Sequence, residues 1–141
     1  MTKKAFRSNC PLSCSMDILG DKWTLVILRD MVFFGKETFK DLAASEEEIA
    51  TNILAARLKQ LVANGLVTKT RSEANKKVFL YQLTGKGIAL LPVLIELVLW
   101  SADHLPADNP QLRVSGLDAI RANKEAVIAN IKKGWEQSQF V

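Results

Sequence analysis

The sequence predicts a mainly α-helical fold with one small β-hairpin, and two patterns support this fold class. Apolar residues recur at helical spacing in several segments, whereas two short segments in the middle of the chain alternate apolar and polar residues. Glycine or proline stands near the ends of the helical segments, where helices commonly begin or stop. With 141 residues, 48% of them hydrophobic and 24% charged, the chain has the size and composition of one globular domain.

The first two helices are predicted from their boundary residues and from an apolar run. Pro11 suits a first helical position, where its missing N–H costs nothing, and apolar residues then recur at helical spacing over 11–19. Asp21 can cap a second helix that continues through residues 23–32 and that Gly35 ends. This second helix is apolar on nearly all sides, so we expect it at the centre of the core.

A short third helix is predicted directly after Thr38. Thr38 and Asp41 have the spacing of a capping box, with aspartate in the position where glutamate is commoner. Phe39 and Leu42 would then face the core. The acidic stretch 45–48 is expected to form a loop.

A fourth, amphipathic helix is predicted over 51–64. Its inward stripe is expected to consist of Leu54, Leu58, Leu61 and Val62. Gly65 follows the last turn, where glycine commonly ends a helix.

The hairpin is predicted from the alternating segments 66–70 and 78–83. Phe79, Tyr81 and Leu83 alternate onto one face of the second strand. The polar stretch 71–77 between the strands is expected to form the tip of the hairpin.

The last part of the chain predicts two further helices. Thr84 can cap a helix over 85–102, which Pro92 should bend or interrupt. A linker is expected over 103–115, followed by an amphipathic helix from Leu117 to about Trp135.

Three short helices followed by a hairpin form a winged helix-turn-helix, in which the last of the three, here the helix predicted over 51–64, enters the major groove and the hairpin lies along the DNA backbone. The charge distribution agrees with this interpretation, because the segment 57–77 carries six basic residues and only one acid, Glu73. The whole chain has a net charge of +4. We therefore divide the chain into a winged-helix DNA-binding domain, residues 1–102, and a C-terminal part, residues 103–141, that we expect to serve dimerisation.

The candidate DNA-binding residues lie on the fourth helix and on the hairpin. Asparagine can pair with adenine and arginine with guanine, alanine permits close approach to thymine methyl groups, and basic residues contact phosphate. The candidates are Thr51, Asn52, Ala55, Ala56, Arg57 and Lys59 on the helix and Arg71, Asn75, Lys76 and Lys77 on the hairpin. The alternatives are a solvated helix face and a charged hairpin tip that only keeps the turn soluble.

The motifs of other functional classes are absent from the sequence. Cys10 and Cys14 are too few for a disulfide framework and lack partners for a zinc site, since the one histidine, His104, lies far along the chain. The sequence has no nucleophile elbow and no phosphate-binding loop, so we expect neither an enzyme nor a cofactor or metal. The longest apolar stretch, residues 88–100, contains Pro92 and Glu96 and is too short to cross a membrane, and no apolar run follows the basic start. We therefore expect a cytoplasmic protein.

Seven segments of this sequence resemble those of a known family. They are Cys10–Pro11, Gly20–Arg29, Phe39–Leu42, Ile49–Leu58, Gly65–Val67, Tyr81–Gly87 and Leu91–Val93. Together they resemble the HxlR-type transcriptional regulators, winged-helix proteins of bacteria and archaea. The resemblance implies a homodimeric DNA-binding repressor or activator that pairs through its first and later helices. The two-fold symmetry of such a dimer would in turn require an inverted-repeat operator. Two features depart from the family pattern: Asp21 stands where glycine is usual, and the segment 103–141 is longer than the common ending.

Cys10 is a candidate redox sensor. It stands directly before Pro11, close to the unpaired N–H groups and the positive end of the first helix, a setting that stabilises a thiolate. The resemblance adds that similar regulators use a cysteine at this Cys-Pro position to sense oxidants or electrophiles. The alternative is an inert, half-buried thiol, and we expect Cys14, one turn later, to serve packing.

Three functions from different classes remain open at this point. The first is a dimeric, sequence-specific transcription factor for double-stranded DNA, and the basic hairpin favours it. The second is a winged-helix protein interaction module that does not bind DNA. The third, an enzyme with Cys10 as nucleophile, lacks a general base, because His104 falls in the expected linker.

Overall fold

The computed structural model describes residues 5–105 and 116–139 of the chain. Contacts divide the chain into two compact units, Met1–Thr84 and Gly85–Val141. The first unit contains α1 (Pro11–Leu19), α2 (Thr24–Phe34), α3 (Phe39–Ala43), α4 (Thr51–Ala63), β1 (Val67–Arg71) and β2 (Phe79–Leu83). The second contains α5 (Gly85–Ile88), α6 (Leu91–His104), α7 (Leu117–Ala122) and α8 (Lys124–Ser138). The predicted fold class, mainly α with one hairpin, is confirmed, and the units divide earlier than the boundary at residue 102 that the sequence suggested.

Capping residues set the ends of α2 and α3. The N-cap residue of α2 is Trp23 and not the predicted Asp21, because the helix begins only at Thr24. The carboxylate of Asp21 still accepts hydrogen bonds from the N–H groups of Trp23 and Thr24, both 2.8 Å long, and so satisfies two donors at the start of the helix. Gly35 ends α2 in the left-handed conformation, with φ of 63°, which glycine adopts without steric cost. The hydroxyl of Thr38 accepts from the N–H of Asp41 at 3.1 Å, which confirms the predicted cap of α3.

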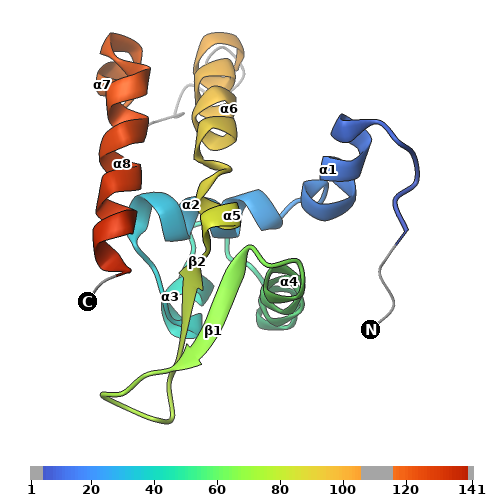
Figure 1. Ribbon diagram of the computed structural model, residues 1–141, viewed down its shortest axis with the longest axis vertical. Helices are drawn as coiled ribbons and strands as arrows, with labels where there is room; N and C mark the ends of the chain where they lie inside the picture. The colour runs from blue at the N-terminus through green and yellow to red at the C-terminus, as the bar shows by residue number, and fades with distance from the viewer. Residues whose placement is uncertain (1–4, 106–115, 140–141) are drawn as a thin grey trace. The chain divides into compact units, whose positions relative to one another are not determined.

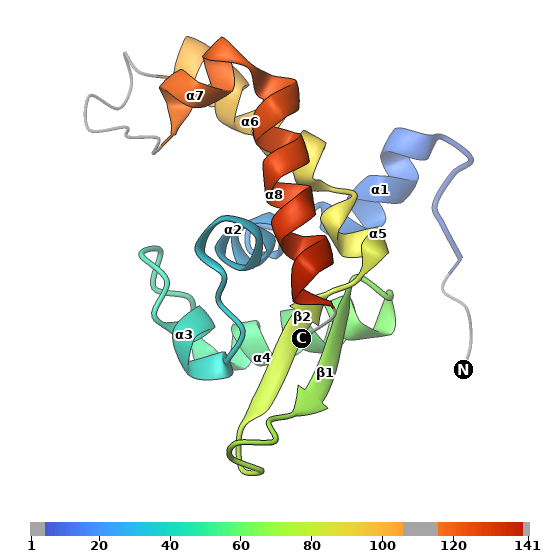
Figure 2. The ribbon, with the colours of Figure 1, turned by 60° about the vertical axis from the view of Figure 1, so that its left-hand side comes forward.

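The core of the first unit lies where α2, α3, α4 and the base of the hairpin meet. Its most buried side chains, each at most 2% exposed, are Leu28, Leu42, Leu54, Leu58, Leu61 and Val67. Figures 1 and 2 both show α4 beside β1, and α3 beside the hairpin. The burial predicted for Val62 is wrong, because one residue beyond Leu61 the helix has turned by about 100° and Val62 faces outward.

The two strands form an antiparallel hairpin with a regular register. Val67 pairs with Leu83 at the base, Lys69 with Tyr81 in the middle and Arg71 with Phe79 near the tip. Since all of these side chains lie on one face, the apolar base of that face packs on the core, whereas its outer end carries two cations against two aromatic rings. The hairpin projects from the first unit as a wing (Figure 2).

The helices of the second unit correct two predictions. The expected helix over 85–102 is two helices, α5 and α6, and Pro92 lies in the first turn of α6, where it needs no hydrogen-bond partner for its nitrogen. The expected single C-terminal helix is also two, α7 and α8. Asn123 separates them with an extended backbone, and its side chain accepts from the N–H of Ala126 at 3.1 Å to cap α8.

The second unit contains a long apolar helical stretch. Residues 85–104 have a mean hydropathy high enough, and a length great enough, for a membrane span, which the shorter run identified in the sequence did not indicate. The composition alone is weak evidence, because core helices of soluble proteins share it. This stretch is interrupted between α5 and α6 and carries the charged Glu96, which pairs with Lys124 of α8 at 2.5 Å.

Candidate nucleic-acid interface

The outward face of α4 carries small and polar side chains. Thr51, Asn52, Ala55, Ala56 and Lys59 are all exposed, while the leucines of the opposite face are buried. The structure therefore brings these five sequence-predicted residues onto one accessible surface. The two alanines leave the helix backbone open to close approach, and the polar side chains flank them.

Arg57 lies at the border of this face and is held by neighbours. Its Nε lies 3.2 Å from Oδ1 of Asp21 in an ion pair, and its Nη1 donates to Oε1 of Gln60 at 3.0 Å. The Nε is buried, and its alignment with the carboxylate is that of an ion pair rather than a hydrogen bond. The side chain thus connects α4 to the residues that cap α2, a contact that the sequence analysis did not foresee.

The groups around Asp21 stabilise the charged carboxylate that this ion pair requires. Burial acts to raise the pKa of its carboxyl group, but hydrogen bonds from the Thr24 hydroxyl and from the backbone of Trp23 and Thr24, together with the charge of Arg57, outweigh it. The pKa of Asp21 is therefore lowered from its ordinary value, and the group is an anion at neutral pH. Asp21 thus has two structural functions: it accepts from two N–H groups at the start of α2, and it pairs with Arg57 of α4.

A second ionic network fixes the turn between α3 and α4. Asp30, only 1% exposed, accepts from Nη2 of Arg29 at 2.7 Å and from Nζ of Lys36 at 3.2 Å. Arg29 also pairs with Glu47, to which the hydroxyl of Ser45 donates at 2.8 Å. The bond from Arg29 lowers the pKa of Glu47 to about 2, against the opposing effect of burial.

This network was missed by the sequence analysis, although a signal was present. Arg29 and Asp30 are adjacent charges inside an otherwise apolar helix, and buried charges are normally paired. One side of α2 is therefore charged, and through Arg29 it contacts the turn that precedes α4.

The wing presents the basic residues of the hairpin. Asn75, Lys76 and Lys77 are exposed at the tip, and the Oδ1 of Asn75 accepts from the N–H of Lys77 at 3.1 Å, so Asn75 also shapes the turn. Arg71 donates to the carbonyl oxygen of Lys76 at 2.8 Å.

Two wing cations stack on aromatic rings. The guanidinium carbon of Arg71 lies 4.8 Å from the ring centre of Phe79, and Nζ of Lys69 lies 4.3 Å from the same centre. Nζ of Lys69 is also 5.8 Å from the ring centre of Tyr81. Cation–π contacts of this kind limit the motion of long side chains and hold positive charge on one face of the wing. Lys69 thereby joins the candidate interface, and its signal in the sequence was its alternation with Arg71 along a strand.

Cys10 occupies the position predicted from its proline neighbour. It is the N-cap residue of α1, and its side chain is exposed. Its N–H donates to the hydroxyl of Ser8 at 3.2 Å, and its carbonyl accepts from the N–H of Cys14 at 2.9 Å. The half-buried thiol of Cys14 donates to the carbonyl of Ser8 at 3.3 Å. Nearby, Arg7 is paired with Asp17.

Metal ligands do not cluster in the described part of the chain. Within residues 5–105 and 116–139, no group of three histidine, cysteine, aspartate or glutamate side chains is placed to hold a metal ion.

Comparisons with known proteins agree with this geometry. The sequence pattern described as HxlR-like helix-turn-helix matches residues 18–109. The HTH-type transcriptional regulator Rv3095 of Mycobacterium tuberculosis is 33% identical over 101 residues, which cover 71% of this chain and 63% of that protein. The match thus spans less than two thirds of that relative.

Solved structures place the fold in the same group. The crystal structure of PA1607, assigned as a transcription factor, has 35% identity and a TM-score of 0.69, and the match covers 77% of this chain and 73% of that chain. The reduced form of the transcriptional regulator YodB from B. subtilis has 29% identity and a TM-score of 0.56, with coverage of 70% and 96%. Since the family pattern covers well over half of the chain and the order of helices and wing agrees with it, this chain belongs to the HxlR-like helix-turn-helix family of transcriptional regulators.

Proposed function

We propose that the protein is a sequence-specific, double-stranded DNA-binding transcriptional regulator that acts as a homodimer in the cytoplasm. The observation that carries this proposal is the exposed face of α4, which combines small and polar side chains beside a basic wing. A helix of this kind fits the major groove, and a basic hairpin fits the adjacent backbone. The family membership supports the same activity.

The residues of α4 are proposed to read bases. Asn52 can donate to and accept from the edge of adenine, and Ala55 and Ala56 can approach thymine methyl groups. Thr51 and Lys59 lie at the two ends of this face and are proposed to contact bases or phosphates. Arg57 is proposed to contact DNA from the border of the face, where Asp21 and Gln60 hold its guanidinium.

The wing is proposed to bind the DNA backbone through Arg71, Asn75, Lys76 and Lys77. Each neutralised phosphate releases counterions and contributes roughly 0.9 to the negative slope of log affinity against log salt. Replacing Lys76 and Lys77 by alanine should reduce that slope by about one to two. Sequence preference should persist, because these lysines are not proposed to touch base edges.

Exposed apolar side chains support a homodimer. On α1, Leu12 and Met16 are 69% and 41% exposed and stand one turn apart, so they share a face. On α6, Val93, Leu97 and Trp100 form a second exposed stripe. A two-fold dimer would bind an inverted repeat whose half-site centres lie about 10 base pairs, or a multiple, apart.

Cys10 is proposed to sense oxidants or electrophiles such as quinones. Its exposure at the N-cap of α1 leaves the thiol accessible to reagents. The solved structures of YodB include a quinone-bound and a diamide-treated form, with 30% identity to this chain in each case. Modification at the start of α1 would alter the same helix that carries the exposed Leu12 and Met16.

Selection of bound sites from a random duplex pool tests the DNA-binding proposal. The expected result is an enriched inverted repeat, bound with an affinity that falls steeply with salt. Absence of binding to any duplex at low salt would instead favour the alternative function, a winged-helix protein interaction module.

The sensing proposal is tested by measuring DNA affinity before and after peroxide or benzoquinone treatment. Wild-type protein should change its affinity, whereas Cys10→Ser should not. Cys14→Ser is the matched control and should respond like the wild type. An equal response of the wild type and Cys10→Ser would remove Cys10 from the proposal.

A further inference from the structure

A pocket of about 420 Å³ opens between the start of α3 and the second strand of the wing. It is lined by Thr38, Phe39, Lys40, Lys77, Val78, Phe79 and Tyr81. None of these lining residues is acidic, and three of them are aromatic. Both walls belong to the first unit, and the N–H of Tyr81 donates to the carbonyl of Glu37 at 2.7 Å, which joins the two walls at their base.

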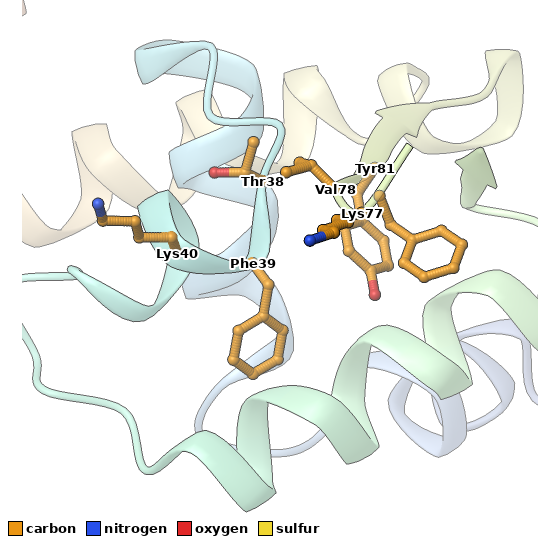
Figure 3. A pocket seen from close by; sticks show the side chains of 7 residues that line it. Thr38, Phe39, Lys40, Lys77, Val78 and Tyr81 are labelled. Atoms are coloured by element: carbon orange, nitrogen blue, oxygen red, sulfur yellow. The ribbon is translucent and has the colours of Figure 1, made fainter. Parts of the chain in front are cut away.

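The polar groups of the pocket converge on one side. Figure 3 shows the hydroxyl of Tyr81 and the amino group of Lys77 directed into the space beside the ring of Phe39, whereas the amino group of Lys40 points away. Tyr81 is only 7% exposed, so its ring is fixed by packing and its hydroxyl is a rigidly placed donor. The pocket therefore offers one hydrogen-bond donor and one ammonium group next to apolar rings.

The charges around the pocket favour an anionic ligand. Lys69 and Arg71 do not line the pocket, but they lie over the ring of Phe79, which does. Glu37 lies before α3 and Asp41 lies within it, but neither of these acidic residues lines the pocket. A ligand with a negative charge is thus favoured over a neutral ligand of the same shape, and a flat ring is favoured by the aromatic walls.

We propose that this pocket is a binding site for a small aromatic carboxylate or sulfonate. Its volume suits a compound with one or two fused rings. The acid group would accept from the Tyr81 hydroxyl and pair with Lys77, and the rings would lie against Phe39 and Phe79. One wall of the pocket is the wing and the other is the start of α3, which precedes α4. Because the wing and α4 are proposed to bind DNA, a bound ligand would also compete with DNA. This last consequence rests on the proposed function, whereas the binding site itself does not.

Binding of 2-naphthoate to the full-length protein without DNA tests the site. We expect saturable binding of one molecule per chain, and at least about tenfold weaker binding of the neutral 2-naphthamide, since a charge-assisted hydrogen bond is lost. Lys77→Gln should weaken naphthoate binding about five- to tenfold, and Tyr81→Phe should weaken it about threefold or more. Lys76→Gln is the matched control, because Lys76 is a neighbouring exposed lysine that does not line the pocket.

Three results would overturn the proposal. They are equal binding of naphthoate and naphthamide, unchanged binding in Lys77→Gln, and displacement of naphthoate by an equal concentration of inorganic phosphate, which would indicate a site for any anion. Lys77 is exposed, so its variant keeps the test valid even where Tyr81→Phe fails to fold. In a separate titration naphthoate should lower DNA affinity, and an unchanged affinity would refute the competition while leaving the binding result intact.

Discussion

Asn52 is the residue of α4 on which base recognition most depends in the proposed function. It is exposed in the first turn, beside the two alanines, and its amide can bind adenine through two hydrogen bonds. Asn52→Ala should cost about 1 to 3 kcal/mol on the selected site and less on random duplex. Fluorescence anisotropy titrations measure both affinities.

The matched control for this substitution is Asn130→Ala, which removes an exposed asparagine from α8. It should leave both affinities unchanged. Equal losses on selected and random DNA for Asn52→Ala would show that Asn52 supports binding without reading sequence.

At the scale of secondary-structure elements, the pair of Asp21 and Arg57 connects the start of α2 to α4. We expect a double-mutant cycle with Asp21→Ala and Arg57→Ala to give a coupling free energy of unfolding of about 0.5 to 1 kcal/mol, because the pair is partly exposed. Asp21→Ala also removes the acceptor of two N–H groups at the start of α2, so it should be the more destabilising single change. Urea unfolding measures these values.

The same cycle, measured by DNA affinity, separates two roles of Arg57. Where Arg57 positions α4 through Asp21, Asp21→Ala should reproduce part of the affinity loss of Arg57→Ala. Where Arg57 reads a base directly, Asp21→Ala should leave the sequence preference unchanged while Arg57→Ala relaxes it at one position.

The turn between α3 and α4 should become less stable in acid because of Glu47. Its pKa is about 2 in the folded protein and 4.5 in its ordinary state, so the carboxylate stabilises the fold above pH 4.5 and this contribution is lost as the pH falls towards 2. Glu47 is about one third exposed, so solvent screening reduces the effect to roughly 1 kcal/mol. The free energy of unfolding, measured with urea between pH 2 and 6, should rise less steeply with pH in Glu47→Gln than in the wild type. The same dependence on pH in both proteins would exclude this contribution.

The elements that could be predicted from sequence are those whose signals are local. Thr38 lies three residues from the N–H it caps, and Gly65 lies one residue beyond Asn64, the C-cap of α4, so each can be recognised within one turn of chain. The alternation of Phe79, Tyr81 and Leu83 likewise indicates one strand face without knowledge of its partner. The outward face of α4 followed from helical spacing alone.

The remaining features depend on residues far apart in the chain. The pair of Asp21 and Arg57 and the pair of Arg29 and Glu47 each join different helices, and spacing within one element does not reveal them. The pocket likewise needs Tyr81 beside Phe39. The break at Asn123 had a local signal, because asparagine favours helix caps over helix interiors. The continuous apolar stripe nevertheless predicted one helix, whereas the Asn123 side chain caps α8 in the structure.

At the scale of the whole molecule, the second unit extends beyond the family pattern. That pattern ends at residue 109, and α7 and α8 follow it. Arg121 of α7 pairs with Asp103 of α6 at 2.5 Å, and Lys124 of α8 pairs with Glu96, a bond that raises the pKa of Lys124. In Figure 1, α8 runs beside α6. The extension therefore covers one side of α6, and another side keeps the exposed stripe of Val93, Leu97 and Trp100.

If the protein dimerises through this stripe, a polar substitution in the stripe should lower the mass of the protein particle in solution. Val93, Leu97 and Trp100 are 42%, 45% and 55% exposed and are spaced four and three residues apart, so they form one apolar face. Trp100→Gln should shift the protein from dimer to monomer at micromolar concentration in light scattering, because a tryptophan that becomes buried on dimerisation contributes a large contact area. Phe34→Gln, at an exposed aromatic residue of α2, is the control that should leave the dimer intact.

The dimer prediction also fixes the form of the DNA site, since two-fold symmetry requires two half-sites in inverted orientation. A monomeric Trp100→Gln should therefore retain weak binding to a single half-site and lose the additional affinity for the inverted repeat, which arises because the second contact is made by an already tethered partner. Titrating wild type and variant against one half-site and against the full repeat measures that difference. Equal affinities of the wild type for the half-site and the repeat would contradict the two-fold arrangement, even with a dimeric mass in solution.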